Sequence, residues 1–117
     1  MAARSLAVYL KYMPHKVIYI ENDNLLQLNG LKNEATGAYV NDAVVTGRLK
    51  DETGADVSGQ SWPVTLQYVA ASNGNYRVTL EETLSLVVGK KYVAEVTAVG
   101  NGLNAKFKTQ FIAVERR

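Results

Sequence analysis

The feature that most constrains this chain's fold is a strict alternation of apolar and polar residues within short segments. In Ala43–Lys50, Val45 and Leu49 fall on one face, and every polar side chain falls on the other. Because side chains of a strand point alternately to its two faces, this pattern predicts a half-buried strand. The same alternation, with its apolar residues facing inward, recurs at Val64–Tyr68, Tyr76–Leu80, Tyr92–Ala98 and Ala105–Phe111.

Turn sequences separate these segments. Asn73-Gly74, within Ser72–Asn75, is the strongest hairpin signal, because Asn-Gly accepts the positive φ angles of tight hairpin turns. Asn101-Gly102 predicts a second hairpin. Further short strands are predicted at Val17–Ile20, at Leu25–Leu28 (ended by Asn29-Gly30), and at the alternating residues Leu84, Leu86 and Val88.

The fold class follows from these strands and from the lack of a strong helical pattern in the body of the chain. A parallel sheet would need crossover helices to connect its strands. A chain of 117 residues without cysteine is long enough for one domain with a complete core. The sequence therefore predicts an all-β fold, an antiparallel immunoglobulin-like β-sandwich of about seven strands with an N-terminal extension.

The N-terminal extension, residues 1–16, precedes a predicted domain at 17–117. Its apolar run is too short for a membrane helix or for the core of a signal peptide. Periodicity leaves a strand and a helix open, and Pro14 interrupts either. We expect the extension to dock on a neighbouring molecule or on the domain's own flank. As a strand, it would dock through Leu6, Val8, Leu10 and Tyr12.

Several catalytic chemistries are excluded by composition. The chain has no cysteine, and its one histidine, His15, lies in the extension. No nucleophile-elbow or phosphate-loop pattern occurs, and the acidic segments Glu21–Asn24 and Asp51–Asp56 lack the ligand spacing of a calcium loop. We therefore expect no enzyme activity, no cofactor and no metal.

Charge is mild in total but uneven along the chain. The net charge is +2, yet residues 17–82 carry four basic and nine acidic side chains. Lys106 and Lys108 share the outer face of the last predicted strand, where lysines commonly protect a sheet edge from aggregation. The strip lacks the interleaved aromatic residues of single-strand binders, which argues against nucleic acid as a partner.

Four stretches carry a family resemblance: 37–43, 49–54, 62–69 and 72–80, the last reading Ser-Asn-Gly-Asn-Tyr-Arg-Val-Thr-Leu. In their combined order they make Asn22–Arg117 similar to a family of small immunoglobulin-like virion proteins of tailed bacteriophages. The resemblance implies an accessory structural role in capsid decoration or at the head-to-tail junction, without catalysis. It also implies a place in the virion, assembled in the bacterial host cytoplasm. The extension departs from the family pattern.

The expected function is therefore that of a non-enzymatic virion protein that binds capsid, neck or tail neighbours. The extension and the sheet edges would make the contacts, in a homo-oligomer or in many symmetric copies, without a membrane. The candidate interface residues are Leu6, Val8, Leu10, Tyr12, Lys106 and Lys108. The alternative is a module that recognises carbohydrate or a host surface, with Trp62 and Tyr39 as stacking residues; Trp62 is otherwise expected at the core.

Overall fold

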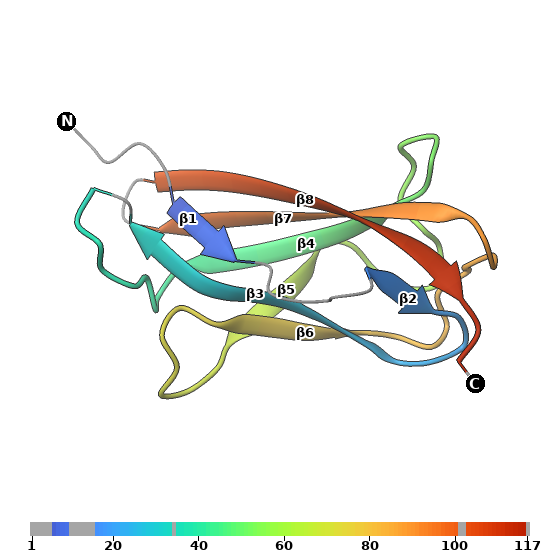
Figure 1. The fold of residues 1–117 in the computed structure, drawn as a ribbon, viewed down its shortest axis with the longest axis horizontal. Coiled ribbons are helices and arrows are strands. Elements are labelled where there is room, and N and C mark those ends of the chain that lie inside the picture. The colour runs from blue at the N-terminus through green and yellow to red at the C-terminus, as the bar shows by residue number, and fades with distance from the viewer. Residues whose placement is uncertain (1–5, 10–15, 34, 101–102, 117) are drawn as a thin grey trace.

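A computed structural model describes residues 6–9, 16–33, 35–100 and 103–116 (Figure 1). The described residues form strands, turns and loops without a helix, which confirms the all-β prediction. The strands are β1 Leu6–Tyr9, β2 Val17–Tyr19, β3 Asn24–Asn33, β4 Val44–Lys50, β5 Val64–Tyr68, β6 Tyr76–Leu80, β7 Lys91–Gly100 and β8 Leu103–Val114.

The strands form one mixed sheet in the order β1-β3-β6-β5-β4-β7-β8-β2. β2 runs parallel to β8 and pairs Val17 with Ile112 and Tyr19 with Val114. The prediction of a wholly antiparallel sheet is therefore wrong. Its premise, that parallel strands need a crossover helix, fails because the whole intervening domain connects β2 to β8. The described residues form eight strands, close to the predicted number of about seven, and the extension contributes one of them, β1.

The sheet turns a corner within β5. Val64, Thr65 and Leu66 pair with β4, and Gln67 and Tyr68 pair with β6. A strand that changes partner in this way lets one sheet fold over itself and enclose a core. The two halves of the sheet consequently face each other in a nearly barrel-shaped molecule (Figure 1).

The core side chains come from the inward faces that alternation predicted. Val45, Leu49, Leu66 and Tyr76 are almost fully buried, and no polar or charged residue of the described chain is buried with them. The inward assignments of β4 to β8 are thus confirmed. The remaining large core residues include Ile18, Leu26, Leu28, Leu31, Leu80, Leu84, Tyr92, Val96 and Phe111.

Three local predictions differ from the structure. Asn73-Gly74 does lie in a hairpin, because β5 and β6 pair antiparallel, but the connection from Tyr68 to Tyr76 is a longer loop than the tight turn that Asn-Gly predicted. This loop is held by β3, because Leu31 N–H donates to Gly74 O at 2.9 Å. This tertiary hydrogen bond adds to a local turn, in which Ser72 N–H donates to Val69 O at 3.0 Å.

β3 continues past Asn29-Gly30, where the sequence predicted its end. Its first half, Asn24–Leu28, pairs with β6, and β1 pairs with its second half up to Asn33. The segment around Leu84, Leu86 and Val88 is not a strand, since Leu84 N–H donates to Glu81 O within a turn. β3 thus continues because it changes partner from β6 to β1, and the alternation at Leu84–Val88 forms no strand because a local turn begins there.

Candidate interaction surface

The last long strand, β8, pairs with β7 along one side. Along its other side, the only described strand that pairs with it is β2, at the C-terminal end of β8. Ala113 exchanges hydrogen bonds with Lys90 and Gly89 on the β7 side, whereas Ile112 N–H donates to Lys16 O on the β2 side. The β7–β8 register runs without a shift from Lys91 to Gly100. The N–H and C=O groups of β8 therefore point alternately toward and away from β7, and those of the even-numbered residues point away from it.

We call the side of β8 that faces away from β7, from Asn104 to Gln110, the β8 edge. Its outward main-chain donors and acceptors belong to Asn104, Lys106, Lys108 and Gln110, and no described strand pairs with them. β1 lies close to β8 but pairs with β3 instead (Figure 1). A row of unpaired groups on a strand is a template for pairing with another strand.

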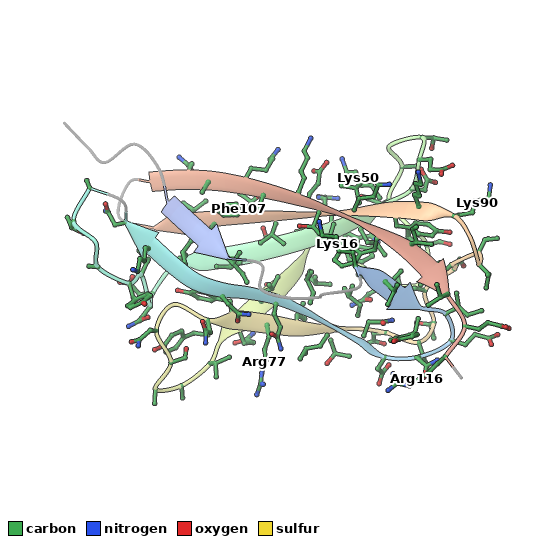
Figure 2. The ribbon with its side chains drawn as sticks, in the orientation of Figure 1. Lys16, Lys50, Arg77, Lys90, Phe107 and Arg116 are labelled. Carbon is green, nitrogen blue, oxygen red and sulfur yellow. The ribbon has the colours of Figure 1, made fainter. Side chains whose placement is uncertain are left out.

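The side chains along the β8 edge also alternate. Those of the even-numbered residues are exposed, and those of Ala105, Phe107 and Thr109 are only partly buried on the inner face. Phe107 packs against the core from β8 near the end of the molecule where β1 lies (Figure 2). An added strand could therefore bury more of this apolar surface, as well as pair with the main chain.

The outer face of β4, β7 and β8 is basic, and we call it the basic face. Glu95 lies at its centre, with one carboxylate oxygen 3.7 Å from Lys50 Nζ and the other 3.8 Å from Lys108 Nζ. Arg48 pairs with Asp56 at 2.7 Å. No described carboxylate lies within ion-pair distance of Lys106. The cations of this face, Arg48, Lys50, Lys91, Lys106 and Lys108, thus outnumber its carboxylates.

The structure brings only part of the predicted interface set together. Lys106 and Lys108 lie side by side on the exposed outer face of β8, as the alternation predicted. Leu6 and Val8 lie in β1, whose main chain pairs with β3 of the same molecule. Leu10 and Tyr12 lie outside the described residues. Docking of the extension on a neighbour thus stays a prediction.

Sequence reasoning missed a groove of about 380 Å³ between β2 and the first half of β3. No local pattern signals it, because its walls come from segments far apart in the chain, around Tyr19, Leu80 and Phe111. Arg116 and Tyr19 both line the groove, and the Arg116 guanidinium lies 4.8 Å from the centre of the Tyr19 ring. Its apolar lining consists of Val17, Ile18, Leu25, Leu26, Leu80 and Phe111.

The two aromatic residues proposed for carbohydrate stacking differ in environment. Trp62 is partly buried against the core, and its indole N–H donates to Val57 O at 2.7 Å. Tyr39 is 42% exposed, and Lys32 Nζ sits 4.8 Å from the centre of its ring. The structure therefore places Trp62 at the core edge and does not join it to Tyr39 in one platform.

Two described groups have clearly shifted pKa values, and both act within the fold. The Thr53 hydroxyl donates to Asp51 and, with the Ala55 N–H, lowers the pKa of that carboxyl. Burial raises the pKa of Tyr76, whose hydroxyl bonds to the main chain. Among the described residues, no group of three or more histidines and carboxylates could hold a metal ion.

Comparisons with protein-family models, curated proteins and solved structures find no match for this chain. In the described part of the chain, no helix has the length and apolar character needed to cross a membrane.

Proposed function

We propose that this protein is a non-enzymatic structural protein of a tailed-phage virion, which binds capsid, neck or tail neighbours by strand addition at the β8 edge. The observation that carries the binding mode is the row of main-chain groups from Asn104 to Gln110 with which no described strand pairs. The virion assignment rests on the sequence resemblance of Asn22–Arg117.

An immunoglobulin-like sandwich is part of this proposal. The strand order supports it, because β1-β3-β6-β5 and β4-β7-β8 correspond to the two sheets of that fold, ABED and CFG. Tyr92, near the start of β7, adds a second similarity. Its hydroxyl accepts a hydrogen bond from Val87 N–H at 2.9 Å, which matches the tyrosine corner of such domains.

Strand addition suits an assembly protein for a physical reason. Main-chain hydrogen bonds supply affinity without a deep pocket, and an extended partner segment needs only a free edge. A virion presents many copies of each component in a fixed arrangement, so weak contacts are multiplied by avidity. The N-terminal extension is a second proposed contact, through Leu6, Val8, Leu10 and Tyr12.

Two substitutions at one position test the binding mode. Lys108→Pro removes an N–H that points away from β7, so the β7–β8 ladder stays intact while the β8 edge is blocked. Lys108→Ala keeps that N–H and is the matched control. Each variant would complement a phage that lacks the gene, and mass spectrometry would measure its copy number on purified particles.

Both variants lose the Lys108 ammonium group, so their difference reports the main-chain N–H alone. We expect Lys108→Ala to occupy the particle at a copy number much closer to that of wild type than Lys108→Pro, which should be largely lost from it. Circular dichroism of the purified Lys108→Pro protein would show that it is folded. Full occupancy by a folded Lys108→Pro protein would contradict strand addition at the β8 edge. Particles that contain no wild-type protein would contradict the virion assignment.

A further inference from the structure

We propose that the strand added at the β8 edge belongs to a different protein and carries acidic residues on its outward face and apolar residues on its inward face. This inference rests on the proposed function, because it names the chemistry of the partner at the same edge.

The outward face of the incoming strand would lie beside Lys106 and Lys108. Residues that are directly opposite on paired strands have Cβ atoms about 4.5–5.5 Å apart, and residues two apart on one strand repeat at about 6.8 Å. Two carboxylates at positions i and i+2 of the partner would therefore meet both ammonium groups. Either strand direction keeps these side chains on the same face.

Among the described residues, every carboxylate that forms an ion pair on the basic face is already paired with a cation of this face. Glu95 already lies between Lys50 and Lys108, and Asp56 is paired with Arg48 at 2.7 Å. Lys106 has no described carboxylate within ion-pair distance. A partner with carboxylates on this face would thus meet uncompensated positive charge.

The same charges disfavour a second copy of β8 as the added strand. Edge-to-edge pairing of two β8 strands would bring the lysines at 106 and 108 of both copies onto one face. Like charges directly opposite each other on paired strands are destabilising. The edge therefore rejects its own copy, and lysines on edge strands are a common device against such pairing.

On the inner face, the partner would meet Ala105, Phe107 and Thr109, which are only partly buried. Apolar residues at the alternate positions of the incoming strand would cover the exposed part of Phe107. The complete specification is a segment of about seven residues in which acidic and apolar side chains alternate.

Three synthetic peptides provide the test against the full-length protein. They alternate valine with glutamate, with glutamine or with lysine, and titration calorimetry at low and high salt measures the affinity of each. We expect the glutamate peptide to bind about three- to tenfold more tightly than the glutamine peptide, with the difference shrinking at high salt.

A charge-reversed protein, with Lys106→Glu and Lys108→Glu together, should prefer the lysine peptide. Equal affinity for the glutamate and glutamine peptides would overturn the acidic-partner inference. Strand addition would still stand if both bind wild type but not the Lys108→Pro variant. Failure of all three peptides to bind wild type would overturn both the inference and strand addition.

Discussion

At the scale of single residues, Tyr76 joins the core to the main chain of a distant loop. Its hydroxyl donates to Val40 O at 2.7 Å and accepts from Ala43 N–H at 3.1 Å, so one side chain holds the loop that leads into β4. Tyr76 itself is 1% exposed. An inward aromatic position was predictable from alternation, but its two distant main-chain partners were not.

We expect Tyr76→Phe to lower the free energy of unfolding by about 1–3 kcal/mol, because the partners of the lost hydroxyl stay in the interior. Urea unfolding monitored by circular dichroism measures this change. Val78→Ala, at a partly buried position of the same strand, is a control for loss of packing without loss of a hydrogen bond. A change below 0.5 kcal/mol for Tyr76→Phe would contradict the role of the hydroxyl.

Because of Tyr76, we expect the stability of the protein to depend on pH in the alkaline range. Burial raises the pKa of Tyr76 above the ordinary tyrosine value of 10.0, so folding favours the protonated phenol. Its contribution to stability is complete below pH 10 and is lost as the pH rises through the folded-state pKa. The stability difference between wild type and Tyr76→Phe should therefore shrink above pH 10. If the stability difference between the two proteins stays constant up to about pH 11.5, well above the usual tyrosine pKa, the role of Tyr76 ionisation is contradicted.

The side chain of Asn24 acts as a strand partner for β2. Its Oδ1 accepts from Tyr19 N–H and its Nδ2 donates to Tyr19 O, both at 2.9 Å. Asn24→Ala should cost about 1–2 kcal/mol of stability and speed hydrogen exchange at the Tyr19 amide. Asn22→Ala, which removes only a bond to Ile20 O, should leave that amide protected.

At the scale of elements, the loop between β5 and β6 shows how tertiary contacts select a conformation. Gly74 N–H donates to Asn41 Oδ1 at 2.8 Å, and a Cβ at Gly74 would lie 2.5 Å from Leu31 O. Gly37 has a similar positive φ, 75° against 72°, but open space around its Cβ position. A side chain at Gly37 would therefore cause backbone strain alone, whereas a side chain at Gly74 would cause the same strain and a steric clash with β3.

We expect Gly37→Ala to lower stability by about 1 kcal/mol, the cost of a left-handed residue with a side chain. Gly74→Ala should cost clearly more, because the loop must also move away from β3. Thermal unfolding of the two variants measures the comparison. Equal costs would mean that the loop relaxes freely and that its bonds to β3 are unimportant.

At the scale of the whole molecule, β1 and β2 close the sheet from opposite ends of the strand order. β1 covers the second half of β3, and β2 covers the C-terminal end of β8. Removal of residues 1–13 should therefore lower the melting temperature, since it leaves Asn29–Asn33 without a partner on that side. Removal of residues 1–5 alone keeps β1 and should have a smaller effect in the same calorimetric scan.

The same deletion tests the extension as a contact between molecules. If the extension binds a neighbour, removal of residues 1–13 should reduce the copy number on purified particles more than the removal of 1–5 does. Unchanged occupancy would contradict that contact and leave the β8 edge as the proposed one.

The sequence by itself determined which face of most strands is buried. Alternation is a local property, so Val45, Leu66 and Val96 could be placed inward without knowing their neighbours. Lys106 and Lys108 could be placed outward for the same reason, and the sparse catalytic inventory was likewise visible in the composition.

Only the tertiary structure decided the pairing of strands that no hairpin joins, whereas the Asn-Gly signals already predicted that β5 pairs with β6 and β7 with β8. Hydrogen bonds between strands join residues far apart in the chain, and alternation is the same whichever partner a strand takes. The parallel pairing of β2 with β8, the change of partner within β5 and the extension of β3 past Gly30 therefore left no local signal. The β8 edge, with which no described strand pairs, is likewise a property of the strand order, because a strand's open side is known only once its neighbours are known.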